Sequence, residues 1–340
     1  SLWVLGKIAL SFVLVALIIE WSIACLLASR MYISAPRENS EEESLILVVT
    51  EFWIYCKPLI LLSFVAFGYN FLDRWMLQFW GGSSEQAFYA VGAQLASVCL
   101  IATAAVTNIF WKEIAESFHR NELTRVHYLY TKASKILFVI NSAAMGALIP
   151  WADEILFLVL GQAYLAGSNA FLVMLFYPIY QSSTTLLTTV LYATEHTSQQ
   201  AKIGYIFMVL SVVASYFLLA PADYPVPGFG LRSDGLALKM VIMVFLQAQL
   251  CMLLVSRLLK LKIDYLHQFK VLTLVLGISF ICKYFVSNFL LTGLVVKILV
   301  SSVFFILFFV GSLYYFPNLI DLTRLQMRTL IIKNLWATNR

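Results

Sequence analysis

Apolar runs long enough to cross a bilayer recur along the whole chain and limit what it can fold into. A helix needs about 20 mainly apolar residues to span the hydrocarbon core. A membrane β-barrel would instead show segments of about ten residues that alternate between apolar and polar. The 340 residues are 61% hydrophobic and only 12% charged, which is about half the charged fraction of a soluble domain. The sequence therefore predicts an all-α polytopic membrane protein.

Hydropathy divides the chain into about nine expected transmembrane helices. The third and fifth are the clearest, and the fourth is interrupted by proline and acidic residues at 150–154. The expected spans are residues 5–27, 52–77, 87–110, 134–150, 170–192, 203–219, 236–255, 271–286 and 290–316.

The positive charges predict the orientation of these helices. Most of the 23 lysines and arginines fall in alternate loops, and the intervening loops hold few. Loops rich in Lys and Arg stay on the cytoplasmic side of a membrane. We therefore expect a cytoplasmic C-terminus, with residue 1 on the outer side.

Four connections differ in composition from the expected spans. Residues 29–44 hold a proline and a run of three glutamates and are expected to be a flexible cytoplasmic linker. Residues 112–135 mix charged and apolar side chains and resemble an amphipathic connection lying in the interface. Residues 220–235 are rich in Pro and Gly, which predicts an ordered irregular outer loop. The basic stretch 317–340 is expected to lie on the anionic inner leaflet.

The residue types that usually carry enzyme or metal chemistry do not form motifs here. The five cysteines are scattered through apolar segments and the four histidines through loops, so neither a disulfide framework nor a metal cluster is expected. Nucleophile-elbow, phosphate-loop and zinc-protease motifs are absent from the sequence. Membrane topology accounts for the basic loops, so nucleic acid is not an expected partner. We expect a protein that is not an enzyme and needs no cofactor.

Charged and polar residues interrupt the apolar run that ends near residue 80. Lys57 lies near one end of this run, and Asn70, Asp73 and Arg74 lie near the other. A charge in hydrocarbon costs several kcal/mol unless it reaches the interface or faces a polar interior. A turn signal, Gly-Gly-Ser-Ser at 81–84, follows and separates this run from the next apolar helix.

The sequence around this turn resembles the start of the second lobe of polysaccharide flippases. These proteins are the O-antigen and related exporters of the multidrug/oligosaccharidyl-lipid/polysaccharide superfamily. The matching residues are Asp73, Arg74, Gly81, Gly82, Tyr89, Val91 and Gly92. Further on, residues 160–167 resemble the short outer segment of these proteins. Residues 227–230 and 234–237 resemble the step that enters a later helix.

The resemblance implies a MATE-like fold and a domain order. Residues 1–28 would be the last helix of the first lobe, and 29–50 a cytoplasmic linker. Residues 51–258 would form the second six-helix lobe. Residues 259–340 would supply two additional helices and a basic cytoplasmic tail. The chain would then be a C-terminal portion, and the earlier helices of the first lobe would lie outside it.

The resemblance also implies a function. A flippase of this family moves a polyprenyl-diphosphate-linked oligosaccharide, such as an O-antigen, capsule or exopolysaccharide repeat unit, across the bacterial inner membrane by alternating access. Its expected partners are the lipid-linked oligosaccharide and membrane lipids. H⁺ or Na⁺ is a candidate coupling ion, and glycan polymerase machinery is a candidate protein partner.

A path for such a substrate needs cations for the phosphates and hydrogen-bonding groups for the sugars. The candidate substrate-binding residues are Lys57, Asn70, Asp73, Arg74 and Gln94. Lys57 and Arg74 could instead be interfacial anchors, and Asp73 could pair with a cation or couple an ion. Asn70 and Gln94 could instead join helices through hydrogen bonds.

Two other positions have expectations of their own. Asn141 is expected to join helices rather than contact substrate. Lys283 is expected to snorkel or to face a lipid groove.

Two other functions remain as alternatives. The first is a cation-coupled multidrug-type antiporter of the same superfamily, which would need deep acidic residues. The second is a membrane-embedded glycan polymerase, which would need a large outer loop or a catalytic constellation.

Overall fold

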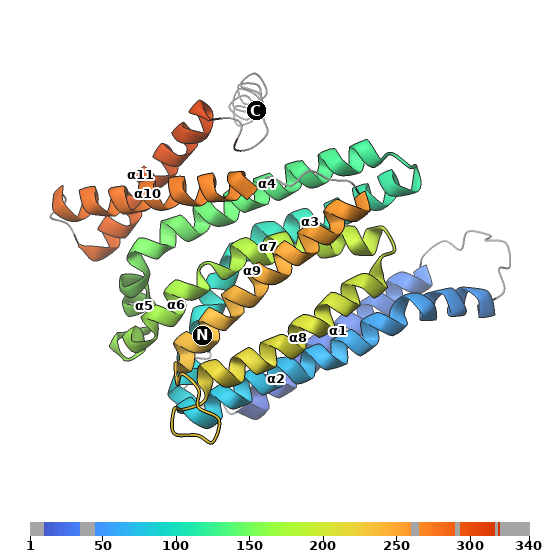
Figure 1. Ribbon diagram of the computed structural model, residues 1–340, viewed down its shortest axis with the longest axis horizontal. Helices are drawn as coiled ribbons and strands as arrows, with labels where there is room; N and C mark the ends of the chain where they lie inside the picture. The colour runs from blue at the N-terminus through green and yellow to red at the C-terminus, as the bar shows by residue number, and fades with distance from the viewer. Residues whose placement is uncertain (1–9, 35–44, 260–264, 290–292, 317–318, 320–340) are drawn as a thin grey trace. The chain divides into compact units, whose positions relative to one another are not determined.

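The structure is a computed structural model of an all-helical chain (Figure 1). It describes the chain except for residues 1–9, 35–44, 260–264, 290–292, 317–318 and 320–340. The α-helices are α1 (Leu10–Ser34), α2 (Leu45–Ser97), α3 (Ile101–His119), α4 (Leu123–Leu148), α5 (Ala152–Leu160), α6 (Ser168–Met174), α7 (Tyr177–Ala193), α8 (Thr197–Leu219), α9 (Arg232–Leu259), α10 (Tyr265–Phe289) and α11 (Leu294–Tyr315). Short 3₁₀ turns η2 (Val98–Leu100), η3 (Ile149–Trp151) and η4 (Gln162–Gly167) join several of them. No strand is found in the described part of the chain.

The chain divides into two units, Ser1–Ile54 and Tyr55–Arg340. The first holds α1 and the start of α2. The second holds the rest of α2 and α3 to α11. Of the predicted linker, residues 35–44 lie outside the described part, as does nearly all of the predicted basic tail.

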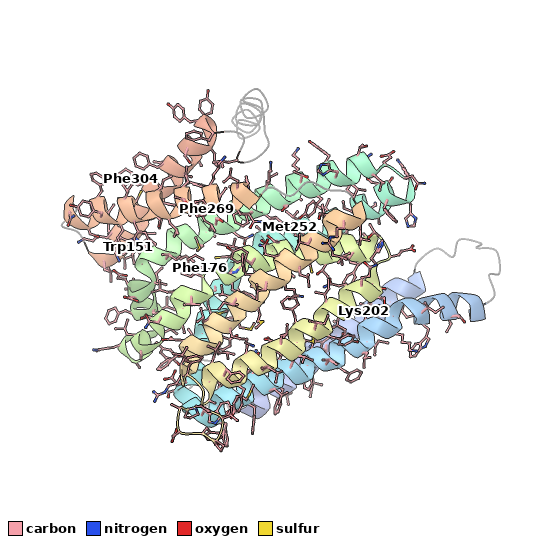
Figure 2. All side chains as sticks on the ribbon, viewed as in Figure 1. Trp151, Phe176, Lys202, Met252, Phe269 and Phe304 are labelled. Atoms are coloured by element: carbon pink, nitrogen blue, oxygen red, sulfur yellow. The ribbon has the colours of Figure 1, made fainter. Side chains whose placement is uncertain are left out.

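Six helical segments of the described chain are long and apolar enough to cross a membrane, or up to seven if the bent α6–α7 pair is one span. The number differs from the expected nine partly because one of them, Phe52–His119, contains two expected spans. Large apolar side chains such as Phe269 and Phe304 are exposed on α10 and α11 (Figure 2). The prediction of a polytopic helical membrane protein is confirmed.

The predicted break after residue 80 is a kink within α2 at Gly82. Its backbone has φ 84° and ψ 177°, a region that only glycine adopts without strain. Gly92, in the matching stretch that follows, lies against the backbone of Phe171, which a Cβ at residue 92 would approach to 3.2 Å. A side chain there would push α6 away from α2.

The structure differs from two expectations about helix continuity. The expected span 170–192 is divided into α6 and α7, which meet at an angle of 40°. Pro178 lies in the first turn of α7, where a missing N–H is tolerated, and it has no N–H to donate to the carbonyl of Met174, at which α6 ends. The expected interfacial connection 112–135 is instead a tight turn between two long helices. Asn121 has φ 58° there, and an Arg125–Glu113 ion pair of 3.1 Å joins the two helices.

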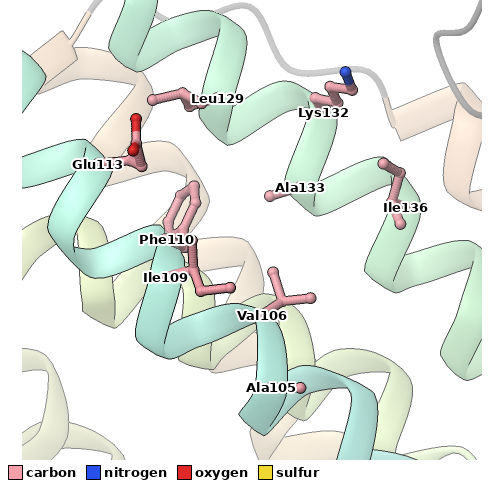
Figure 3. A pocket seen from close by; sticks show the side chains of 9 residues that line it. All are labelled: Ala105, Val106, Ile109, Phe110, Glu113, Leu129, Lys132, Ala133 and Ile136. Carbon is pink, nitrogen blue, oxygen red and sulfur yellow. The ribbon is translucent and has the colours of Figure 1, made fainter.

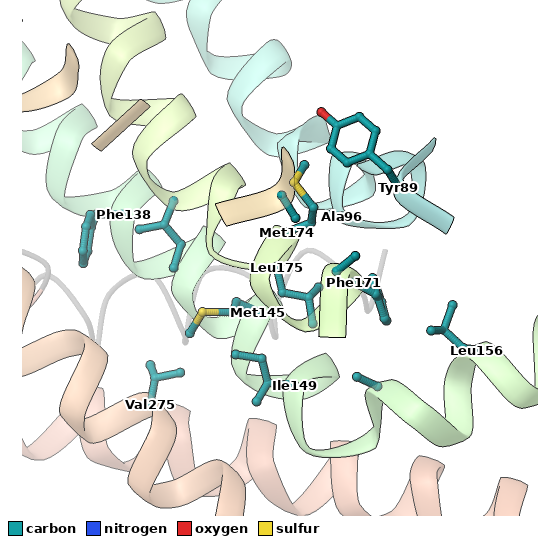
Figure 4. Close-up of a cluster of buried hydrophobic side chains, with 14 of the residues drawn as sticks. Tyr89, Ala96, Phe138, Met145, Ile149, Leu156, Phe171, Met174, Leu175 and Val275 are labelled. Carbon is teal, nitrogen blue, oxygen red and sulfur yellow. The ribbon is translucent and has the colours of Figure 1, made fainter. Parts of the chain in front are cut away.

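The core of the second unit has two apolar clusters. One joins the second half of α2 to α4, α6, α9, α10 and α11, and includes Phe138, Met145, Phe171 and Leu175 (Figure 4). The other joins α3, α4, α7, α8 and α9. The α7 helix packs against α3, α4 and α9, and no residue of α7 is fully exposed. The predicted irregular loop is found between α8 and α9, and its outer placement stays a prediction.

Candidate functional site

A buried carboxylate marks the most polar point of the described interior. Asp73 lies on the face of α2 that also carries Tyr69, Met76 and Leu77, which are one helical turn from it. It is only 4% exposed. A carboxylate buried among apolar helices needs a compensating charge and hydrogen bonds.

Lys239 of α9 supplies that charge. Its ammonium donates a short hydrogen bond to Oδ2 of Asp73, and its side chain is 0% exposed. The same ammonium donates to the phenol oxygen of Tyr69 at 3.0 Å and lies 4.8 Å from the centre of the Tyr69 ring. These contacts of the Lys239 head group all come from α2.

Two serines of α8 complete the network. Ser215 Oγ donates to Oδ1 of Asp73 at 2.6 Å, and Ser211 Oγ lies 3.1 Å from the Tyr69 hydroxyl. These serines are four residues apart and therefore face the same side of α8. We call Tyr69, Asp73, Ser211, Ser215 and Lys239 the buried polar network. It joins α2, α8 and α9.

The network is close to neutral and satisfies its own hydrogen bonds. Removing one partner of a buried ion pair usually destabilises a protein by about 3–5 kcal/mol, because the other charge stays buried. In this conformation neither Asp73 nor Lys239 is open to a ligand. The arrangement can hold three helices together, and it can respond to a proton or cation only if the pair separates.

The five predicted site residues are not brought together. Asp73 is buried in the network, whereas Lys57, Asn70, Arg74 and Gln94 are exposed. Asn70 and Arg74 lie one turn apart on α2, about 40° from each other around the helix. The Asn70 amide donates to the carbonyl of Ala66 in its own helix at 2.8 Å. Of the five, Asn70 and Arg74 form the closest pair of exposed polar positions.

Lys57 is remote from that pair. At 1.5 Å per residue it lies roughly 25 Å from Arg74 along α2, and it points about 160° away from Asp73 around the helix. Lys57 and Arg74 therefore cannot bind one diphosphate at the same time. Gln94 lies beyond the kink at Gly82.

A polar stripe on α7 was not among the predicted site residues. Gln181, Thr185 and Thr188 recur at intervals of about one turn and are half-buried. Thr188 accepts a hydrogen bond of 2.9 Å from Gln200 of α8. This helix therefore presents amides and hydroxyls within an otherwise apolar bundle.

The sequence did contain a signal for the main missed residue, Lys239. It lies within the apolar run L-A-L-K-M-V-I-M-V-F, where the cost of a charge demands a partner. Its nearness to the start of α9 favoured an interfacial position instead. Ser211 and Ser215 carried no comparable signal, since serines are common at helix contacts in membranes.

Two further expectations have clear outcomes. Asn141 joins helices as predicted, because its amide donates to Thr103 Oγ1 at 3.2 Å. The expectation for Lys283 is wrong: it forms a 2.9 Å ion pair with Glu154 and lies 4.8 Å from the ring centre of Trp151. A nearby carboxylate and indole are better partners for an ammonium than lipid is.

Comparison with known proteins supports the fold. No family model and no curated protein matches the chain. Among solved structures, the lipid II flippase MurJ in an inward closed conformation aligns with a TM-score of 0.60 and 14% identity. The alignment covers 83% of this chain and 57% of that one, so the chain spans little more than half the length of the flippase. The chain is therefore a multi-pass helical membrane protein whose fold is similar to that of this flippase.

Proposed function

We propose that the chain acts in a flippase that moves a polyprenyl-diphosphate-linked oligosaccharide across the bacterial inner membrane by alternating access. We further propose that the cargo is an O-antigen, capsule or exopolysaccharide repeat unit. The observation that carries the proposal is the structural likeness to a lipid II flippase over 83% of the chain. The proposed activity is transport without covalent chemistry.

Exposed groups on α2 and half-buried groups on α7 suit such a cargo. Arg74 offers a permanent cation with five donors, which matches phosphate oxygens. Asn70 lies one turn away and could add an amide contact. Gln181, Thr185 and Thr188 of α7 offer neutral groups of the kind that bind sugar hydroxyls. Lys57, roughly 25 Å from Arg74 along α2, would meet the diphosphate at a different stage of its passage.

The buried polar network bears on ion coupling. H⁺ and Na⁺ are the candidate coupling ions, and either of them would bind to a carboxylate. Asp73 already has Lys239 as its counterion. An external cation at Asp73 would therefore have to displace the lysine, which would loosen α2 from α9.

The pairing of Asp73 with Lys239 also bears on the antiporter alternative. A cation-coupled multidrug antiporter would need a free acid deep in the lobe. Among the side chains that the structure describes, Asp73 is the one buried carboxylate, and it is paired. A glycan polymerase would need a larger outer domain than the irregular loop between α8 and α9. We therefore place both functions behind the flippase.

Complementation of a strain that lacks the flippase tests the proposal. The full-length gene would carry Arg74→Ala or Lys57→Ala, and Arg257→Ala and Lys202→Ala would serve as controls. Arg257 and Lys202 are exposed basic residues on α9 and α8 (Figure 2 labels Lys202). At matched protein levels we expect Arg74→Ala to reduce surface polysaccharide and to trap lipid-linked units on the inner face.

Three outcomes would count against the proposal. Normal polymer in both the Arg74→Ala and Lys57→Ala strains would remove these cations from the path. Lipid-linked units that reach the outer face but stay unpolymerised in a strain without the gene would point to a polymerase. Altered drug resistance in that strain, with unchanged polymer, would point to an antiporter.

A further inference from the structure

A groove of about 440 Å³ runs between α3 and α4 (Figure 3). Its walls are mostly apolar, with two charged residues toward the turn that joins the helices. The lining residues are Ala105, Val106, Ile109, Phe110, Glu113, Leu129, Lys132, Ala133 and Ile136.

Small residues on both helices open the groove. Ala105 lies on α3 and Ala133 on α4, and neither side chain is large enough to fill the space between the helices. Phe110 is only 5% exposed and packs into the core. The hollow is thus built from side chains on well-formed helices.

The position of the groove limits what can occupy it. Both walls belong to candidate membrane spans, Phe52–His119 and Leu123–Leu160. Apolar walls offer few hydrogen bonds, so a polar solute would lose its hydration there without compensation. Lipid chains surround helices that span a membrane, and an acyl chain is apolar enough to occupy a groove with apolar walls.

The charged residues at the end of the groove near the α3–α4 turn indicate the charge of the lipid head group that would lie there. Glu113 is already engaged by Arg125 at 3.1 Å. The Lys132 ammonium donates to the phenol of Tyr128 at 3.1 Å, which leaves it two further donors. Residues 111–135 carry five Lys or Arg against three Glu. This excess of positive charge favours an anionic head group.

We propose that this groove is a binding site for an anionic diacyl glycerophospholipid. One acyl chain lies between Ala105 and Ala133, and the phosphate lies at Lys132. This site is separate from the buried polar network and from Arg74, and it does not depend on which cargo the protein moves.

Native mass spectrometry of the purified full-length protein tests the acyl-chain part. The protein would be reconstituted in nanodiscs containing equal amounts of phosphatidylglycerol and phosphatidylcholine, and then released into detergent. Ala105→Phe fills the groove, whereas Ala104→Phe adds the same ring at an exposed neighbour outside the lining. We expect Ala105→Phe to retain several-fold less phosphatidylglycerol than Ala104→Phe. Equal retention by these two variants would overturn the proposal.

The head-group part is tested with Lys132→Gln, which needs no repacking and remains informative even if Ala105→Phe folds poorly. Lys202→Gln, an exposed lysine on α8, is its control. We expect Lys132→Gln alone to lose the preference for phosphatidylglycerol over phosphatidylcholine. No such preference in the wild-type protein would overturn the proposal. Retention of added undecaprenyl phosphate in place of phosphatidylglycerol would do the same.

Discussion

Two junctions in the second unit are each joined by a lysine from an apolar helix, but the lysines lie in different surroundings. In the buried polar network, the side chains of Lys239 and Asp73 are 0% and 6% exposed. At the junction of η3, α5, α10 and α11, the side chains of Lys283 and Glu154 are 31% and 27% exposed. Desolvation raises the cost of an unpaired charge, so the first pair should be far more sensitive to the loss of one partner than the second.

The two lysines also differ in the groups that surround them. Serine and tyrosine hydroxyls surround the Asp73–Lys239 pair. At the other junction, Lys283 also donates to the carbonyl of Pro150, and the indole of Trp151 donates to Ser301 Oγ at 3.1 Å. The same type of residue thus has a closed hydrogen-bonding environment in one place and a half-exposed one in the other.

Lys239→Met tests the largest expected difference. It leaves Asp73 buried without a counterion, so we expect a loss of about 3–5 kcal/mol in the free energy of unfolding. The measurement is reversible unfolding in detergent micelles. The double variant Asp73→Asn with Lys239→Met removes both charges and should recover most of that loss. A loss under about 1 kcal/mol in the single variant would show that water reaches the pair.

Ser215→Ala tests the hydrogen bond to the carboxylate of the same network. A hydrogen bond to a charged group contributes about 1.5–3 kcal/mol, and we expect a destabilisation of that order by the same unfolding assay. Ser302→Ala is a suitable control, because the Ser302 hydroxyl donates to the carbonyl of Ile298 in its own helix. Equal effects of the two changes would argue that Asp73 does not need Ser215.

Ser301→Ala probes the second junction without touching a charge. It leaves the indole N–H of the buried Trp151 without the acceptor seen here, which should cost about 1–2 kcal/mol. In the Ser301→Ala/Trp151→Phe double variant the hydrogen bond is already absent, so the second change should cost no further hydrogen-bond energy. A double-mutant cycle on the two residues measures their coupling, and a coupling near zero would contradict the bond.

Lys283→Met should have the smallest effect. The Lys283–Glu154 pair is partly exposed, and such pairs contribute roughly 1 kcal/mol or less. Raising the salt concentration should reduce the contribution further, because salt screens exposed pairs more than buried ones. A loss as large as that of Lys239→Met, or one unaffected by salt, would remove the distinction between the two junctions.

Much of the fold could be predicted from sequence, because a span is a local property of composition. The break at Gly82 and the irregular loop between α8 and α9 follow from glycine and proline chemistry, and both were predicted. The division of α6 from α7 was missed, although Pro178 provided a local reason for it. Hydropathy averaged over a window does not register a single proline inside an apolar run.

The candidate site was less predictable. Asp73 and Arg74 are adjacent in sequence, yet one is buried and the other exposed. Their directions differ by about 100° around α2, but the sequence alone does not say which direction faces a neighbouring helix. Whether Arg74 and Lys57 contact a substrate stays a prediction.

Composition along the chain is enough to predict a multi-pass helical protein and the places where charged residues interrupt its apolar runs. A bilayer imposes one length and one composition on every span, and both can be read along the chain. The partners of the buried charges are visible only once the helices are packed: Asp73 pairs with Lys239 across 166 positions, and Glu154 with Lys283 across 129. Such pairs depend on which helices pack together and on which side of each faces the other, and the sequence of neither helix contains that information.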